Sequence, residues 1–146
     1  MPDKSLIGRS LGVTQCEVEK GRLRFFAKAI GETDPIYTDE TAAREAGHHS
    51  LPVPPSFLTC LEAEGRDSDH IVQQVFGFDL GRILHAEQGF EYHALAYAGD
   101  VLTFDTRVVD VYEKKGGALT FVVQQTRVTN QLGQHIADIR CSLVQR

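Results

Sequence analysis

The hydrophobic pattern changes from a helical period in the first half of the chain to a strand period in the second. Leu23, Phe26, Ala27 and Ile30 recur at i, i+3, i+4 and i+7. This spacing places four apolar side chains on one side of a helix. We therefore predict an amphipathic helix over residues 17–30, ended by the glycine that follows it.

Two shorter helices are predicted before the pattern changes. One spans about residues 39–46, begins at Thr38 or Asp39 as its cap, and ends at Gly47. The other spans about residues 56–64 and follows Pro55, because proline suits the first position of a helix. The second helix is apolar over much of its surface, and we expect it to be buried.

The remaining chain alternates apolar and polar residues with a period of two, which is typical of strands. The predicted strands span residues 84–93, 101–113, 118–129 and 135–144. Turn residues at 115–117 and 130–133 predict antiparallel hairpins between neighbours. Residues 65–82 are interpreted as a loop with room for one short helix. Helices followed by long strands predict an α+β fold, with one buried helix wrapped by a curved antiparallel sheet.

Composition narrows the class of protein. The 146 residues fit a single domain over residues 1–146. A net charge of −5, with no basic run, argues against nucleic acid as a partner. No segment approaches the roughly 20 apolar residues of a membrane helix, and the polar start predicts a cytoplasmic protein. Cys16, Cys60 and Cys141 are expected to be free thiols, the last two in the core.

Four segments in this order resemble the hot-dog fold of the MaoC-like hydratases and dehydratases, and are most similar to the FAS1-like dehydratase branch with its (3R)-hydroxyacyl dehydratase subunits. The segments are Phe26-Ala27-Lys28-Ala29-Ile30-Gly31-Glu32-Thr33-Asp34-Pro35-Ile36-Tyr37, the helix at 39–47, Val53-Pro54-Pro55-Ser56-Phe57-Leu58, and residues 84–93 followed by Ala98-Gly99-Asp100. The family's catalytic loop reads Gly-Asp-x-Asn-Pro-(Ile/Leu/Val)-His. This chain has Glu32, Asp34 and Tyr37 at the Asp, Asn and His positions.

The resemblance implies reversible hydration of a 2-enoyl thioester carried by CoA or acyl-carrier protein. It places the amide groups that polarise the thioester carbonyl at Ser56 and Phe57, where a helix begins, and makes Pro55, which stiffens the approach to them, part of the same substrate-binding turn. His85 is a second candidate for substrate binding, through the pantetheine arm. The alternative is that His85 and His93, expected on one face of a strand, make ordinary strand or interface hydrogen bonds.

The acid–base pair of the family is altered in this chain. A general base near neutral pH suits histidine, with a pKa of about 6.5, and not tyrosine, with a pKa of about 10. We therefore interpret the chain as the acyl-binding subunit of a two-hot-dog enzyme, paired with a catalytic MaoC-like subunit. The alternatives are a self-sufficient homodimeric hydratase using Glu32, Asp34 and Tyr37, a binding protein without turnover, and a hot-dog thioesterase.

No metal or cofactor is expected. His48 and His49 are adjacent in a loop but lack a third ligand. The Asp67-Ser68-Asp69-His70 segment lacks the later glycine and glutamate of a calcium loop, so we interpret it as solvated. No Gly-x-Gly-x-x-Gly or P-loop pattern indicates a nucleotide site.

Overall fold

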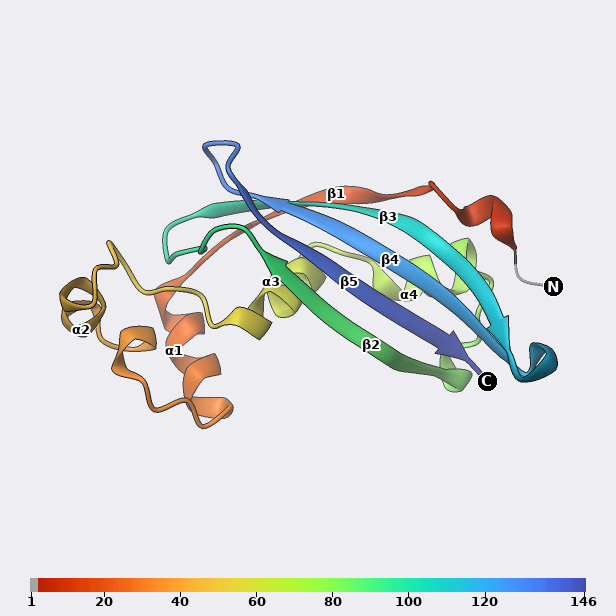
Figure 1. Ribbon diagram of the computed structural model, residues 1–146, viewed down its shortest axis with the longest axis horizontal. Coiled ribbons are helices and arrows are strands. Elements are labelled where there is room, and N and C mark those ends of the chain that lie inside the picture. Colours follow the sequence, from red (N-terminus) through yellow and green to blue (C-terminus); the bar gives the residue numbers. More distant parts are fainter. Residues whose placement is uncertain (1–2) are drawn as a thin grey trace.

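The structure is a computed structural model that describes residues 3–146, and within these residues the chain forms a five-stranded antiparallel sheet with helices on one side (Figure 1). The strand order is β1-β3-β4-β5-β2. The strands are β1 (Ser10–Glu17), β2 (Ile83–Tyr92), β3 (Val101–Lys114), β4 (Leu119–Thr129) and β5 (His135–Gln145). The α-helices are α1 (Lys20–Ala29), α2 (Glu40–Glu45), α3 (Leu58–Glu64) and α4 (Ser68–His70).

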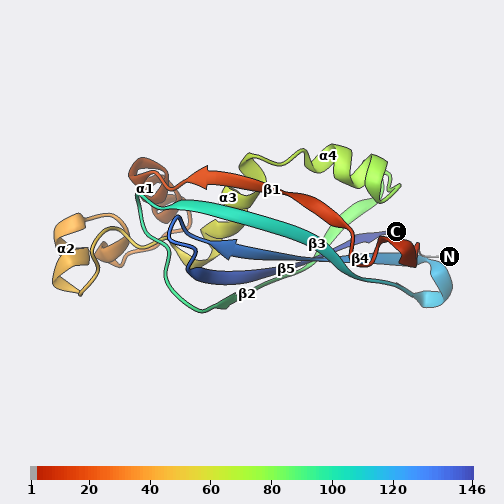
Figure 2. The same ribbon diagram turned by 90° about the horizontal axis from the view of Figure 1, so that it is seen from above.

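The sheet is bent, and α3 lies against its concave face (Figure 1). A single 3-10 turn, Pro55–Phe57, leads into α3, and a π-helical turn, Ile71–Val75, follows α4. Figure 2 shows α3 and α4 in succession along the same side of the sheet. Helices α1 and α2 lie beyond one end of the sheet, and the two chain ends lie near the other (Figure 1). This arrangement confirms the predicted α+β fold with a helix inside a curved sheet.

The alternation of β3 explains how the concave face is filled. Leu102, Phe104 and Val108 are buried on that face, as a period of two requires. The register against β4 shifts between Val108 and Asp110, so the next buried apolar residue is Val111. An extra residue in one strand of a pair bends that strand, which is consistent with the curvature of the sheet around α3.

β1 is the element that the sequence does not predict. Its burial alternates poorly, and only Cys16 among its residues is buried. Gly12 has a φ of 105° and the register against β3 shifts beside it. A strand that is exposed on most positions and interrupted by a glycine in the left-handed region gives no period-two signal.

Three expectations about buried side chains are corrected by the structure. Ile30 lies past the end of α1 and is 53% exposed, because the helix ends at Ala29. Cys60 is exposed, since α3 turns it away from the sheet, and Cys141 is half-buried. The expected burial of the central helix is confirmed on one side, where Glu62 is buried with Leu58 and Leu61.

The part of the chain that is described, residues 3–146, contains no helix long and apolar enough to cross a membrane.

We predict that Leu58→Ala lowers the free energy of unfolding by about 2–5 kcal/mol, because Leu58 is 0% exposed and its loss leaves a cavity between α3 and the sheet. Urea unfolding followed by circular dichroism measures this change. The matched control is Cys60→Ala on the same helix, where the exposed side chain limits the change to about 0.5 kcal/mol. Equal losses in the two variants would contradict the burial of this helix face.

Candidate functional site

The loop after α1 uses both of its carboxylates to hold its own backbone. Gly31 has a φ of 72° and turns the chain away from the helix. Glu32 Oε1 then accepts a hydrogen bond from the amide of Asp34 at 3.0 Å. Asp34 Oδ1 accepts one from the amide of Ile36 at 3.1 Å, and so caps the 3-10 turn Pro35–Tyr37. Both candidate carboxylates are therefore engaged in local structure.

Tyr37 lies at the end of this loop, and its surroundings disfavour its ionisation. Burial raises the pKa of Tyr37, and the nearby carboxylates of Glu32 and Asp34 raise it further. All three effects disfavour the phenolate. The structure therefore brings the three predicted catalytic residues together, with Tyr37 held as a neutral phenol at physiological pH.

Tyr92 connects this loop to the start of the central helix. Its hydroxyl donates a hydrogen bond to the carbonyl oxygen of Pro55. Burial raises the pKa of Tyr92, and so does the neighbouring Tyr37. Tyr92 thus contacts Pro55 and also lies near Tyr37, from a distant part of the chain. Sequence analysis missed Tyr92, because its position at the end of β2 gives no signal that its side chain reaches another element.

Ser56 and Phe57 occupy the turn that leads into α3. The amide of Phe57 donates to the carbonyl of Pro54 at 2.9 Å. The amide of Ser56 is in the first turn, where helix geometry offers no acceptor within the helix. The Phe57 ring packs on Phe26 of α1 with centroids 4.6 Å apart, and the Arg22 guanidinium lies 5.6 Å from its centroid.

Two cavities adjoin the central helix from opposite ends. One, of about 400 Å³, lies between α1 and Phe57 and is lined by residues that include Phe25, which is 76% exposed. The other, also about 400 Å³, lies along α3 and is lined by His85 among others. His85 therefore belongs to the second cavity. The structure brings Pro55 near Tyr37 through Tyr92, but it places His85 on the wall of a separate cavity.

The expectation that His85 and His93 share a face is wrong. The register of β2 against β5 shifts between His85 and Glu87, so one extra residue separates the two histidines. His85 lines the cavity along α3, whereas His93 contacts Asp138. Asp138 lies on the outer face of the sheet, in a shallow hollow that it shares with side chains of β3 and β4.

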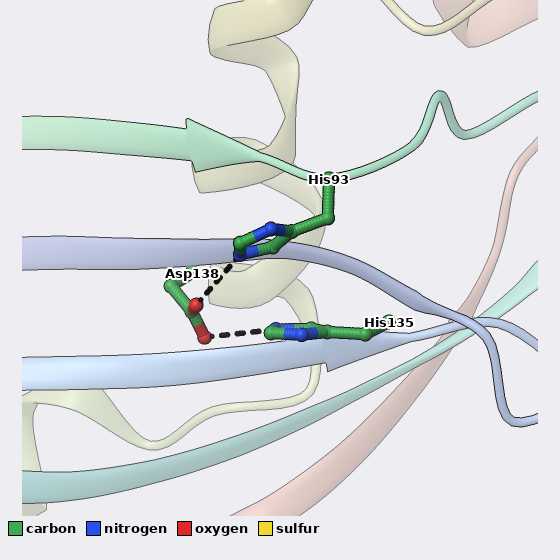
Figure 3. A group of neighbouring side chains, drawn as sticks. All are labelled: His93, His135 and Asp138. Atoms are coloured by element: carbon green, nitrogen blue, oxygen red, sulfur yellow. Dashed lines mark hydrogen bonds and ion pairs between the residues drawn. The ribbon is translucent and has the colours of Figure 1, made fainter.

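On this outer face His93, His135 and Asp138 form a compact hydrogen-bonded cluster (Figure 3). The two carboxylate oxygens of Asp138 each contact one imidazole Nε2, at 3.1 Å for His93 and 3.0 Å for His135. A register shift opposite Thr129 inserts Ile136 and turns His135 toward Asp138, although the two are three apart in sequence.

This cluster is the group in residues 3–146 whose ligand atoms are close enough to share a metal ion, all within 4.8 Å of one another. Two imidazoles and a carboxylate are a donor set that zinc accepts. In the structure each imidazole is already hydrogen-bonded to the carboxylate, so the cluster is satisfied without a metal. The adjacent His48 and His49, which the sequence analysis discounted as metal ligands, pack against Tyr97.

Comparisons with known proteins agree with this architecture. The family model of the FAS1-like dehydratase domain region matches residues 5–139. A UPF0336 protein of Streptomyces coelicolor is 31% identical over 145 residues, covering 99% of this chain and 95% of that protein.

Solved structures show the same fold. The chain resembles the HadBC (3R-hydroxyacyl-ACP dehydratase) complex of Mycobacterium tuberculosis with a TM-score of 0.74 and 22% identity, over 92% of this chain and 96% of that chain. It resembles the R-hydratase PhaJ1 of Pseudomonas aeruginosa with a TM-score of 0.70 and 17% identity, and the match covers 95% of this chain and 81% of that chain. These likenesses confirm the hot-dog fold that the sequence resemblance implies.

We predict that the outer-face cluster makes stability sensitive to acid. Partial burial raises the pKa of Asp138, but hydrogen bonds from His93 and His135 outweigh it and hold the pKa below its usual range. A carboxylate with a lowered folded pKa stabilises the protein above the unfolded value of about 3.9 and loses that contribution as the pH falls through the folded pKa.

Asp138→Asn should therefore flatten the pH dependence of the free energy of unfolding below about pH 4, as measured by urea unfolding at several pH values. The control is Asp105→Asn on the same outer face, where the carboxylate contacts Arg107 and no histidine. An unchanged slope in Asp138→Asn would contradict the prediction.

Proposed function

The chain belongs to the FAS1-like dehydratase family, and from that premise we propose that it is the acyl-binding, non-catalytic subunit of a two-hot-dog hydratase/dehydratase. The reaction we assign to the complete enzyme is the (R)-specific addition or removal of water at an acyl thioester of CoA or acyl-carrier protein. This chain contributes the thioester site and part of the acyl site. A catalytic MaoC-like subunit contributes the acid–base pair.

The observation that carries the proposal is the state of Tyr37. A general base for water must be deprotonated near the working pH. Tyr37 stands where the family has histidine, and burial together with Glu32 and Asp34 raises its pKa above the ordinary value for tyrosine. The pKa of Tyr37 is thus shifted further from the near-neutral value that a general base requires.

The two loop carboxylates do not replace the missing base. Each already accepts a hydrogen bond from a backbone amide of the loop, which holds the carboxylate against the turn. Moving either oxygen toward a substrate would leave an amide of the turn without its partner. These two hydrogen bonds support a structural role for both carboxylates, which is to hold the shape of the loop.

The start of α3 supports the binding role. The amide of Ser56 lies in the first turn of the helical segment, and Pro54 and Pro55 restrict the backbone before it. A thioester carbonyl oxygen accepting a hydrogen bond from this amide would lie close to Tyr92, which is bonded to Pro55. The apolar cavity at Phe25, Phe26 and Phe57 adjoins the same turn.

The sheet supports pairing with a second hot-dog. β1 and β2 are the outer strands of the sheet in residues 3–146, and each pairs with one neighbour. Proteins protect such edges by covering or pairing them, because unpaired backbone groups attract other strands. The (3R)-hydroxyacyl-ACP dehydratase of Mycobacterium tuberculosis, whose structure this chain resembles, is a HadBC complex.

The second candidate is a self-sufficient homodimeric hydratase. The observation in its favour is that Glu32, Asp34 and Tyr37 lie in one loop beside Tyr92. In that case Glu32 and Asp34 activate the water and Tyr37 orients it.

An assay with crotonyl-CoA separates these functions. We predict that the purified chain gives no hydration, and that hydration appears when a catalytic MaoC-like subunit from the same organism is co-purified with it. Absorbance of the enoyl thioester measures the reaction. Hydration by the pure chain that is lost in Glu32→Ala and Asp34→Ala would instead establish the self-sufficient enzyme. Release of free thiol would establish a thioesterase.

Placing the family's Asp and His in this loop should give the isolated chain hydratase activity. We predict that the isolated Glu32→Asp/Tyr37→His variant hydrates crotonyl-CoA about a hundredfold faster than a matched variant without the imidazole, because general acid–base catalysis contributes at least that much. The matched control is Glu32→Asp/Tyr37→Phe, which changes the same positions without supplying an imidazole. Equal rates in the two double variants would show that the loop is not placed for catalysis.

A further inference from the structure

The outer-face cluster of His93, His135 and Asp138 has no part in the proposed function, and the pairing of two strands sets its geometry. The amide of His93 donates to the carbonyl of Ile136 at 2.8 Å, which fixes the residue after β2 against β5. The register shift in β5 brings His135 to the same face as Asp138. Three potential metal ligands are thus held together by backbone that belongs to the sheet.

The ligand atoms are spaced for one metal ion. Nε2 of His93 lies 3.1 Å from one carboxylate oxygen of Asp138, and Nε2 of His135 lies 3.0 Å from the other. A tetrahedral zinc ion with bonds of about 2.1 Å holds its ligand atoms about 3.4 Å apart. With one atom taken from each residue, all three lie within 4.8 Å of one another. Figure 3 shows the two imidazole rings side by side, both directed at the carboxylate.

The imidazoles can give up their present hydrogen bonds to a metal without leaving the neutral state. Because a carboxylate only accepts, each Nε2 atom that bonds to Asp138 carries a proton. Zinc binds neutral imidazole, so this proton must move to Nδ1. Neither Nδ1 atom makes a hydrogen bond within residues 3–146, and both rings are partly exposed, so water accepts from Nδ1–H.

The neighbouring charges leave the site suited to a cation. Across the sheet Asp138 is paired with Arg127 of β4 and with Glu91 of β2. Directly opposed residues direct their side chains to the same face. The positive and the negative neighbour offset each other, so the charge of Asp138 remains. Two imidazoles beside one carboxylate favour zinc and similar transition metals, whereas calcium and magnesium prefer oxygen ligands alone.

We propose that His93, His135 and Asp138 form a surface site for a divalent transition-metal ion, with zinc as the ion of best fit. The ion binds Nε2 of each histidine and one oxygen of Asp138, and water fills the fourth position.

A bound ion cross-links the end of the edge strand β2 to β5. The last ladder pair between these strands is Tyr92 with Ala137, and the site lies one residue beyond it. Tyr92 is also the residue that contacts Pro55 at the start of the central helix. The inference is independent of the proposed function, because neither the ligands nor the cross-link requires a thioester.

The test is zinc binding to the full chain, purified without a histidine tag and treated with EDTA. Isothermal titration calorimetry at neutral pH should give one zinc ion per chain with a dissociation constant on the order of 1 µM. Zinc at about a hundredfold excess over this value should raise the midpoint of thermal unfolding by about 5–10 °C. Magnesium and calcium chloride at the same concentration should give neither result.

Two variants locate the site. His93→Ala removes one ligand from the end of β2, and Asp138→Asn removes another while keeping the size of the side chain. Each should raise the dissociation constant at least about tenfold, because even the loss of an outer-shell partner weakens metal binding by that much. Each should also abolish the rise in the unfolding midpoint. The matched control is His70→Ala, an exposed histidine of α4, which should bind zinc as the wild-type chain does.

Absence of zinc binding to the wild-type chain at about 100 µM zinc would overturn the inference. Binding that both ligand variants retain would also overturn it. So would binding that is lost only in His48→Ala/His49→Ala, since the ion would then lie in the loop before the central helix. None of these outcomes bears on the acyl-binding function.

Discussion

The structure depends on the burial of α3 against the concave face of the sheet. A helix of seven residues is too short to be stable alone, so it is held by contacts that bury Leu58 and Leu61 completely. The same burial encloses Glu62 and Arg66. Because a charged side chain loses hydration when it is enclosed, each must be paired, and the sheet supplies Thr106, Thr126 and Gln124 for that purpose.

This constraint explains why Glu62 and Arg66, which form the polar end of the cavity along α3, are fixed in place. Removing one member of a buried ion pair leaves the other uncompensated, which is far more costly than replacing both. The network therefore cannot rearrange freely. Its donors converge on one oxygen of Glu62, so the position of this charged pair on the cavity wall is set by the packing of α3 against the sheet.

The sequence was sufficient for the layers of the fold and for the residues that form the turn after α1, because both are encoded locally. The period-two pattern of β3 is legible along the strand itself, and Gly31, Asp34 and Pro35 specify a turn within a few residues. The sequence was insufficient wherever a single inserted residue changes the face of a strand. Such an insertion beside His85 placed it on the inner face while His93 lies on the outer face.

The same limit applies to residues that act through distant partners. Tyr92 bonds Pro55, which is 37 residues away in sequence, and Arg66 bonds Gln124, which is 58 away. No local pattern encodes these pairings. β1 was missed for a related reason, since it is held by the ladder to β3 and has little apolar surface of its own to bury.

The edge strand β2 joins these features into one arrangement. Its first half contributes Ile83 and His85 to the wall of the cavity, and its last residue, Tyr92, reaches the carbonyl of Pro55 at the start of α3. One edge of β2 pairs with β5, and its other edge carries no strand in residues 3–146. A second hot-dog added to this edge would lie beside both the cavity and the turn that we propose as the thioester site. The chain would then need no acid–base pair of its own, because the partner's loop could reach the substrate that this chain holds.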